Sequence, residues 1–370
     1  MRILIYQPRV SYYVGGGEIV PINQAKLLIE KGFDVIFVTS CADWIKESDI
    51  FKEFKNKFSS NIIQVNIPER LKKIYEVEPG LNWERWDKES IHFGLHVKKV
   101  IDEIDYDVAF FHAPLDLIAL NQEKKNIGYL HGYPESINYA CLILLDNQSE
   151  FIAVSDKVKE KWDELLPNKN IEVIYNGIDN AYFCPSGESN KIIDLLFVGR
   201  LIENKGIINL LPIFKKITNL NKDIRIAIVG DGPLSDQISN YIVDNNLEQN
   251  IHKYGYLPHG KLLDLYKTSR IGIFPSISKE GLLTTVLEAT SCGVPAISSK
   301  GLGLDVYIKN GINGFLINPN DEDSIVNLVV KIINDEQKLN EMSDNARKIS
   351  LDWGWDKKIE KLEKVLKRYE

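Results

Sequence analysis

The chain has 370 residues, of which 44% are hydrophobic and 26% are charged, and its formal net charge is −7. This composition is typical of a soluble protein with a large core, the length suggests two domains, and the acidic balance argues against bulk binding of nucleic acid. The cysteines show no spacing typical of a zinc site or a disulfide framework: Cys41, Cys141, Cys184 and Cys292. We therefore expect reduced thiols in a cytoplasmic protein. We expect no signal peptide, because the start, MRILIYQP, runs directly into a strand pattern, and no membrane span, because no apolar run approaches the length required.

The first half of the chain opens with an α/β pattern. Residues 2–7 predict a buried strand, residues 18–31 an amphipathic helix and residues 33–39 the next strand. The loop before the helix, VSYYVGGGE, lacks GxGxxG, so a dinucleotide-binding fingerprint is not supported. Its glycines Gly16 and Gly17 permit close approach of the backbone to a ligand, and a flexible turn is the alternative.

Residues 42–103 are less regular. Helices are predicted near 44–57 and 88–103, with a strand near 61–66 between them. The stretch 46–57 mixes phenylalanines with lysines, which we interpret as a solvated helix packed on one side. The alternative is a helix lying on an anionic membrane surface, which would make the protein peripheral at the inner membrane face.

Two histidines follow predicted strands in this half. The strand at 107–111 ends in His112, and the strand at 126–130 ends in His131. Because open α/β sheets bind ligands at the carboxyl ends of their strands, His131 is a candidate for contact with a sugar, whereas we interpret His112 as structural. Further strands are predicted at 151–154 and 171–174, and the aperiodic residues 180–191 predict an interdomain linker.

The second half repeats the alternation. Strands are predicted at 192–198, 224–229, 252–256 and 271–274, and helices near 320–334, 336–349 and from 355 onward. The first of these strands leads into GRLIENKG, where Arg200 and Lys205 would neutralise a diphosphate; two solvated surface cations are the alternative.

The stretch 271–297 reads as strand, loop, helix, turn and strand. Glu280 lies in the loop or first helical turn, and Glu288 lies eight residues further on, about 12 Å along a helix. The two carboxylates therefore suit the two ends of an extended ligand, and the helix N-terminus between them suits a diphosphate. A nucleotide-sugar fits this layout, and the alternative is one Glu at a helix start and another on a solvated face.

Several motifs together resemble the retaining glycosyltransferases of family 4. They are GGGE, LHG, FIAVSDKVKEKW, VIYNGID, FVGRLIENKG, IAIVGDGP, KYGYLP, EGLLTTVLEATSCGVPAI and NGINGFLI, in the order and spacing of that family over nearly the whole chain. The resemblance implies the α/β GT-B architecture, with two Rossmann-like doubly wound parallel-sheet domains facing across a cleft. It places an acceptor-side domain at 1–185, a donor-binding domain at 192–350 and a last helix, 355–370, back on the first domain.

The resemblance also assigns roles by position. His131 would face the donor sugar, and Glu280 the transferred sugar. Arg200 and Lys205 would bind the donor diphosphate, and Glu288 the ribose. The remaining donor-binding positions that the resemblance implies are Gly16, Gly17, Tyr256, Leu257, Leu283, Thr284 and Thr285. The family commonly has an aromatic-glycine pair after the first Glu-Gly, and Leu282 and Leu283 replace it here, which leaves the identity of the sugar open.

We therefore expect transfer of a hexose-type sugar from a nucleotide diphosphate-sugar to a glycan or lipid-linked acceptor, in surface polysaccharide or glycoconjugate assembly. We expect no cofactor and no metal, because the two D-x-D strings, at 105–107 and 321–323, read as structural. The alternatives are a nucleotide-sugar epimerase of the same architecture, which needs no acceptor, and a two-domain sugar-binding protein without catalysis.

Overall fold

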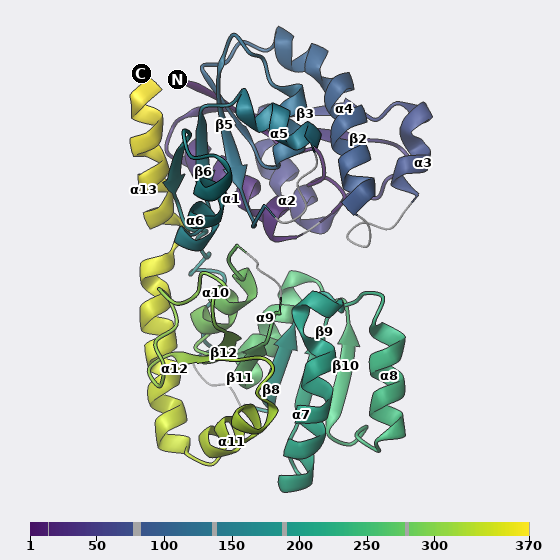
Figure 1. Cartoon of the computed structure of the whole chain (residues 1–370), viewed down its shortest axis with the longest axis vertical. Coiled ribbons are helices and arrows are strands. Elements are labelled where there is room, and N and C mark those ends of the chain that lie inside the picture. The colour runs from purple at the N-terminus through teal and green to yellow at the C-terminus, as the bar shows by residue number, and fades with distance from the viewer. Residues whose placement is uncertain (14, 77–82, 135–138, 187–190, 278–280, 370) are drawn as a thin grey trace. The chain divides into compact units, whose positions relative to one another are not determined.

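The computed structural model describes every residue except 14, 77–82, 135–138, 187–190, 278–280 and 370. The chain divides into two compact units (Figure 1). The first unit comprises Met1–Asn176 and Trp355–Glu370, and the second comprises Gly177–Gly354. Each unit has its own parallel sheet with helices on both faces, which is the doubly wound α/β arrangement.

The sheet of the first unit has the strand order β3-β2-β1-β4-β5-β6-β7. Its strands are β1 (Arg2–Tyr6), β2 (Asp34–Cys41), β3 (Ile62–Asn66), β4 (Val108–Phe111), β5 (Lys125–Leu130), β6 (Glu150–Ala153) and β7 (Asn170–Val173). The order reverses between β1 and β4, and such a switch point is where open α/β sheets leave a crevice for ligands.

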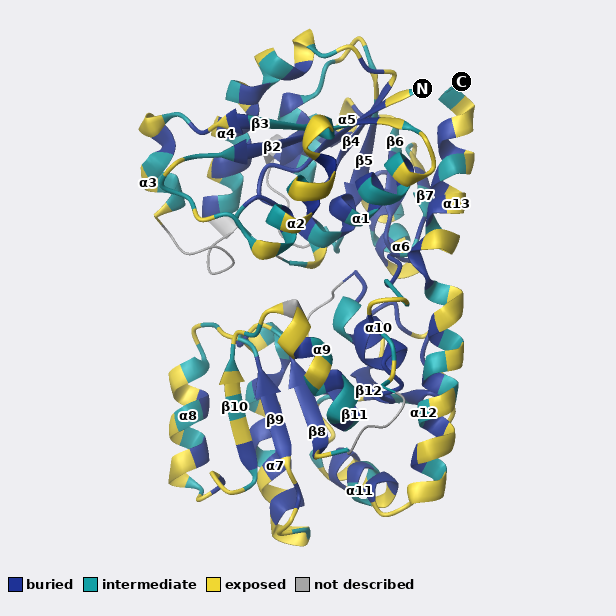
Figure 2. Cartoon of the chain, turned by 180° about the vertical axis from the view of Figure 1, so that it is seen from behind, coloured by how far each residue is buried: buried dark blue, intermediate teal, exposed yellow. Residues whose placement is uncertain are grey.

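Helices cover both faces of this sheet, and each face has its own apolar core. The helices are α1 (Gly16–Glu30), α2 (Asp49–Phe58), α3 (Lys72–Tyr75), α4 (Trp83–Glu103), α5 (Tyr139–Asp146), α6 (Asp156–Leu165) and α13 (Trp355–Leu366). Figure 2 shows the strands as largely buried between these helices. The short helix α3 was not predicted from the sequence.

Helix α2 carries the mixture of phenylalanines and lysines noted in the sequence. Its side chains Phe51, Phe54 and Phe58 are buried in the core that α1 and α13 share. Lys55 pairs with Glu47 at 2.9 Å and Lys57 with Glu30 at 2.9 Å. The helix is therefore packed on one side and solvated on the other, and its apolar face is occupied by the protein itself.

The last helix, α13, belongs to the first unit although it ends the chain. Ile359, Leu362 and Val365 are buried in the same core as α1, and Lys31, the residue that follows α1, pairs with Glu363 of α13 at 2.6 Å. In the part of the chain that the structure describes, no helix is both long and apolar enough to cross a membrane.

The sheet of the second unit has the strand order β10-β9-β8-β11-β12-β13. Its strands are β8 (Ile193–Val198), β9 (Ile226–Val229), β10 (Ile251–Gly255), β11 (Ser269–Phe274), β12 (Ala296–Ser299) and β13 (Gly314–Ile317). The helices are α7 (Ile207–Leu220), α8 (Ser235–Asp244), α9 (His259–Thr268), α10 (Thr284–Ser291), α11 (Glu322–Ile333) and α12 (Glu336–Ser350). Here the order reverses between β8 and β11.

The boundary between the units lies earlier than the predicted linker. Residues 177–185, which the sequence-based division gave to the first domain, belong to the second unit. Arg347 of α12 donates to the carbonyl of Phe183 at 3.0 Å and to that of Asn180 at 3.1 Å, and Ser291 Oγ lies 2.6 Å from the Phe183 carbonyl. These bonds fix the segment on α10 and α12.

Candidate active site

The loop that follows β8 contacts the loop that follows β9. The amide of Gly199 donates to the carbonyl of Val229 at 3.0 Å, and the amide of Leu201 donates to that of Asp231 at 2.9 Å. Gly230 has φ +136°, and a Cβ there would stand 1.8 Å from the carbonyl oxygen of Gly199. Only glycine allows this approach, so the two loops form one layer at the carboxyl edge of the sheet.

The same loop also contacts the segment that leads from β11 to α10. The amide of Ile277 donates to the carbonyl of Asn204 at 2.9 Å. Gly206, at φ +70°, ends the short turn Glu203–Lys205 and begins α7, and a Cβ on it would lie 2.1 Å from the carbonyl oxygen of Pro275. Since β8 and β11 are parallel neighbours, the loop at 199–206 and the start of α10 open at the same edge of one sheet.

The predicted cations lie on this edge. Arg200 is exposed and Lys205 is half-buried. The side chain of Lys205 folds over the loop, with its Cδ 3.9 Å from the position of a Cβ on Gly199. Tyr256 and Leu257 follow β10 at the same edge, and Tyr256 is 67% exposed. The edge therefore presents two cations and an accessible aromatic ring.

Helix α10 begins without a side-chain cap. Its N-cap residue is Leu283, in an extended conformation, and its first residues, Thr284 and Thr285, are half-buried. The first amides of a helix lack partners within the helix, so this N-terminus can donate to an anion. Glu280 lies outside the described residues.

Glu288 lies one turn further along α10, on the face of Thr284. Its side chain is buried, at 7% exposure, and it accepts a hydrogen bond from the Tyr266 hydroxyl of α9 at 2.9 Å. Burial, and next the Glu288 carboxylate, raise the pKa of Tyr266 well above its usual value. Sequence reasoning missed Tyr266, because a tyrosine on an apolar helix face gives no sign of which neighbouring helix it meets.

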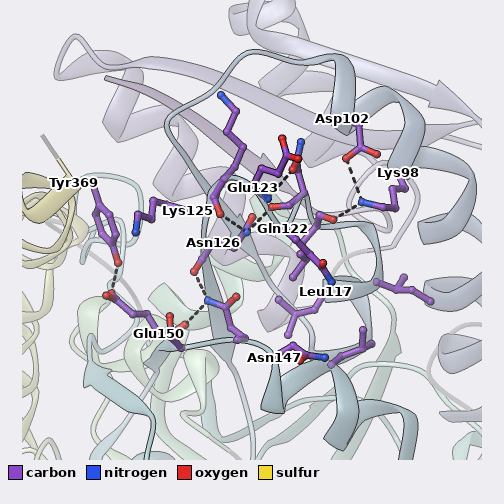
Figure 3. A pocket seen from close by; sticks show the side chains of 17 residues that line it. Lys98, Asp102, Leu117, Gln122, Glu123, Lys125, Asn126, Asn147, Glu150 and Tyr369 are labelled. Carbon is purple, nitrogen blue, oxygen red and sulfur yellow. Dashed lines mark hydrogen bonds and ion pairs between the residues drawn. The ribbon is translucent and has the colours of Figure 1, made fainter.

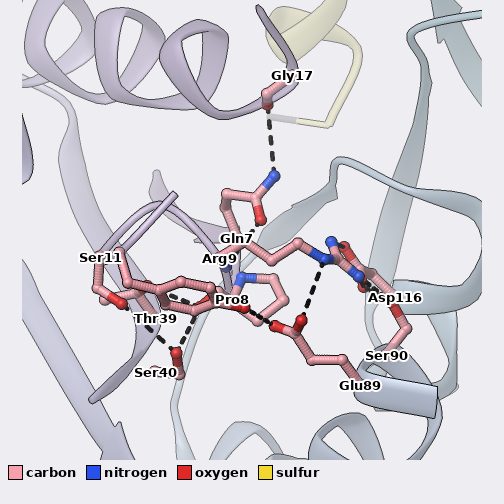
Figure 4. Close-up of polar contacts among 11 residues, drawn as sticks. Gln7, Pro8, Arg9, Ser11, Gly17, Thr39, Ser40, Glu89, Ser90 and Asp116 are labelled. Carbon is pink, nitrogen blue, oxygen red and sulfur yellow. Dashed lines mark hydrogen bonds and ion pairs between the residues drawn. The ribbon is translucent and has the colours of Figure 1, made fainter. Parts of the chain in front are cut away.

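In the first unit, Gly16 and Gly17 form the first turn of α1. Gln7, just after β1, donates to the carbonyl of Gly17 at 3.4 Å, as Figure 4 shows. A Cβ on Gly17 would meet no atom within 4 Å, so the backbone here has open space beside it.

A buried ionic network holds the loop between β1 and α1. The guanidinium of Arg9 lies 3.2 Å from the carboxylate of Asp116 and 3.9 Å from that of Glu89, and Ser90 donates to Asp116 at 2.7 Å (Figure 4). All four side chains are buried. Burial raises the pKa of Glu89 although Arg9 opposes this shift. The residues come from three separate segments, and sequence reasoning missed the network for that reason.

His131 and His112 follow β5 and β4 and lie together. Nδ1 of His112 is 3.0 Å from Nε2 of His131, and the rings are 5.3 Å apart at 27°. Burial lowers the pKa of His131 to about 4 and places that of His112 well below its usual value, with His131 as the second cause. Trp162 of α6 donates to the carbonyl of Gly132 at 2.7 Å and anchors the turn after His131.

A hollow of about 940 Å³ lies at the other edge of this sheet. Figure 3 shows it between Lys98 of α4, Asn126 at the start of β5, Glu150 at the start of β6, and Tyr369. Asn126 and Glu150 mark the amino ends of their strands, whereas Gly17, His112 and His131 lie at the carboxyl ends of strands. The hollow is therefore separate from the candidate active site.

The two D-x-D strings make contacts within the protein. Asp107 accepts from the backbone amide of Arg2 at 2.7 Å. Asp321 caps α11 by accepting from the amide of Ser324 at 3.2 Å, and Asp323 pairs with Lys216 at 2.8 Å. Each of these three carboxylates therefore has a partner within its own unit.

Comparisons with known proteins identify the family of the chain. Residues 14–182 match the family model described as "Glycosyltransferase Family 4", and residues 181–349 match the model described as "Glycosyl transferases group 1". The chain belongs to the family 4 glycosyltransferases. The prediction of family and of GT-B fold is thereby confirmed.

Relatives of this glycosyltransferase include enzymes of known and unknown specificity. An uncharacterized glycosyltransferase of Methanocaldococcus jannaschii is 27% identical over 99% of this chain and 97% of its own length. A UDP-Gal:alpha-D-GlcNAc-diphosphoundecaprenol alpha-1,3-galactosyltransferase of Escherichia coli is 32% identical over 61% of this chain and 60% of its own length. The crystal structure of HepE from Anabaena, in complex with UDP and glucose, has the same fold, with a TM-score of 0.76, 19% identity and 99% of each chain covered.

Proposed function

We propose that this glycosyltransferase moves a hexose-type sugar from a nucleotide diphosphate-sugar to a hydroxyl of a glycan or lipid-linked acceptor, with retention of anomeric configuration and without a metal. The observation that carries the proposal is the carboxyl edge of the second unit. There the loop with Arg200 and Lys205 is bonded through Asn204 to the segment before the uncapped start of α10. Cations and helix amides together suit a diphosphate leaving group.

The residues along this edge suggest where the diphosphate, the ribose and the base of the donor would each bind. Its diphosphate would meet Lys205 and the amides near Thr284, and its ribose hydroxyls would meet Glu288, whose orientation Tyr266 fixes. Its base would lie near Tyr256 at the end of β10. A uridine donor is the first to test, because the Escherichia coli relative is named for UDP-Gal and the HepE crystal holds UDP. The acceptor class follows the same relative, which is named for a diphosphoundecaprenol-linked sugar, and surface polysaccharide or glycoconjugate assembly is the setting proposed.

Transfer of the sugar to the acceptor oxygen needs no cofactor in this mechanism. The acceptor oxygen forms a bond to the anomeric carbon, and the bond from that carbon to the donor phosphate oxygen breaks. The departing phosphate takes the proton of the acceptor hydroxyl, and attack from the face of the leaving group retains the configuration. Negative charge grows on the phosphate in the transition state, and positioned donors such as Arg200 and Lys205 stabilise it.

Neutral His131 would serve in binding. Because its pKa is about 4, the imidazole is uncharged near neutral pH and can orient a sugar hydroxyl without protonating the leaving group. In this proposal, Gly16 and Gly17 leave backbone space for the donor diphosphate and the acceptor.

The test is a donor screen with the purified full chain. Uridine, guanosine and adenosine diphosphate-sugars are incubated with and without a lipid-linked or glycan acceptor, in EDTA and in Mn²⁺. We expect acceptor-dependent release of one nucleoside diphosphate, a product with the donor's anomeric configuration by NMR, and full activity in EDTA. An inverted product contradicts the mechanism, activity that needs Mn²⁺ contradicts metal independence, and epimerised donor without acceptor indicates an epimerase.

A further inference from the structure

The strand register brings His112 and His131 together. Strands β4 and β5 pair in parallel with Phe111 opposite Gly128, so the next positions, His112 and Tyr129, are neighbours. Side chains alternate along a strand, which places Tyr129 and His131 on one face. The ring of His112 stacks on that of Tyr129 at 4.4 Å and 17°, and this stack fixes the plane from which His112 reaches His131.

The hydrogen bond between the two rings has two forms. Nδ1 of His112 and Nε2 of His131 are 3.0 Å apart, so one nitrogen carries the proton and the other accepts it. If His112 donates from Nδ1, its own Nε2 is a bare lone pair and His131 carries its proton on Nδ1. If His131 donates from Nε2, His112 carries its proton on Nε2 and His131 has a lone pair on Nδ1.

The surroundings of His112 distinguish these forms. His112 is 3% exposed, and its Nε2 has no hydrogen-bond partner among the described residues. The second form would leave a buried N–H without an acceptor, which folded proteins rarely tolerate, whereas the first leaves only an unused lone pair. The first form is therefore the favoured one.

We propose that His112 is a positioning residue, whose Nδ1–H donates to Nε2 of His131 and holds His131 as the tautomer with its proton on Nδ1. His131 then offers an N–H donor to a hydroxyl oxygen of the transferred sugar. The contact between His131 and the sugar rests on the proposed function, whereas the hydrogen-bonded pair does not. The inference adds a residue that sequence reasoning had left as structural.

The first test observes the tautomer directly. In ¹⁵N-histidine-labelled protein near pH 7, long-range ¹H–¹⁵N spectra identify which nitrogen of each of the six histidines carries a proton. Signals of the pair are assigned with the variants His112→Phe and His131→Phe. We expect His131 protonated on Nδ1 in the wild type, and a mixture of tautomers in His112→Phe. A wild-type His131 protonated on Nε2 overturns the proposal, whether or not the protein is active.

The second test is kinetic and uses matched variants. His112→Phe keeps the stacking ring but loses the donor, and His112→Asn keeps an N–H near the position of Nδ1. We expect kcat/KM to fall about tenfold in His112→Phe, a loss typical of one orienting hydrogen bond, and to recover partly in His112→Asn. His92→Phe, on the exposed side of α4, is the control and leaves kcat/KM unchanged.

The outcomes separate the two proposals. If the wild type transfers sugar and His112→Phe equals it, the positioning role is wrong while the transferase function stands. If the wild type transfers no sugar from any donor, the proposed function fails, and the spectra still decide the tautomer. Should His112→Phe fail to fold, His112→Asn carries the kinetic test: an Asn variant that matches His131→Phe in activity contradicts rescue by the retained donor.

Discussion

The contact between Gly206 and Pro275 gives the sharpest test of how the donor edge is built. Gly206→Ala would place a methyl carbon 2.1 Å from the Pro275 carbonyl oxygen, at a backbone φ of +70°. The positive φ and the Pro275 carbonyl both belong to the backbone, so no side-chain rotation can relieve the clash. The loops after β8 and β11 must therefore separate for the methyl group to fit. Gly32→Ala is a matched control, because Gly32 has φ +88° and a Cβ there would meet nothing within 4 Å.

The magnitudes follow from these two environments. A left-handed φ costs a non-glycine residue about 1 kcal/mol, and this cost applies to both variants. Forcing a methyl group into close-packed backbone costs a further ~2 kcal/mol, and only Gly206→Ala bears it. The melting temperature of a unit of this size falls by roughly 2–4 °C per kcal/mol, so Gly206→Ala should lower it by about 6–12 °C and Gly32→Ala by about 2–4 °C.

The assay combines thermal unfolding with calorimetry of nucleoside diphosphate binding. We expect the donor affinity of Gly206→Ala to fall about tenfold or more, because the turn that carries Lys205 moves away from α10. Gly32→Ala should bind the nucleotide as the wild type does. Equal melting temperatures for the two variants, or unchanged nucleotide affinity in a folded Gly206→Ala, would refute the reasoning that this contact sets the donor edge.

Three further predictions concern charges and protons. Lys205→Ala should weaken nucleoside diphosphate binding by about tenfold without changing the fold, since one charge-assisted contact contributes about 1.5–3 kcal/mol. Glu203→Ala, in the same turn, is the control and should strengthen the binding or leave it unchanged. An equal loss of affinity in both variants would contradict the assignment of Lys205 to the diphosphate. Arg9→Met should lower the free energy of unfolding, measured in urea melts, by about 3–5 kcal/mol, because the Asp116 and Glu89 carboxylates stay buried without their cation. A loss under about 1 kcal/mol would contradict a stabilising role for Arg9 in this network. The pKa of His131 is about 4 in the folded state and about 6.5 in the unfolded state, so the unfolded state binds more protons between these two pH values, and stability falls as the pH decreases from 6.5 to 4. His131→Phe should reduce this dependence of stability on pH in thermal melts recorded from pH 7 to pH 4. An unchanged dependence would contradict the lowered pKa.

Much of the fold is predictable from the sequence because strands buried on both faces are continuous apolar runs. The strands predicted at 192–198 and 271–274, for example, correspond to β8 (Ile193–Val198) and β11 (Ser269–Phe274), within one or two residues at their starts. The resemblance to the family then predicted two Rossmann-like domains, whereas the strand order within each sheet comes from the structure. The bounds of helix α5 could not be predicted, because its residues, YACLILLD, are apolar almost all round and show no helical period.

The contacts that hold the site are the part that sequence reasoning could not supply. Residues 180–183 read as linker by composition, yet Arg347 binds their carbonyls from more than 160 positions away. Arg9, likewise, meets Asp116 from across the chain. The pairing of His112 with His131 was accessible in principle, because both strand ends were predicted, but the register that aligns them appears only in the assembled sheet.

The composition of the first unit from two separate stretches of chain has a consequence for biosynthesis. A ribosome delivers residues 177–354 as one uninterrupted stretch, and that half can acquire its complete core while the chain is still attached. The amino-terminal half emerges first but is completed later, since Ile359, Leu362 and Val365 of α13 are made only after the whole of the second unit. Nascent molecules therefore expose the flank of α1 until α13 has been made, and deletion of residues 355–370 would leave that flank open permanently.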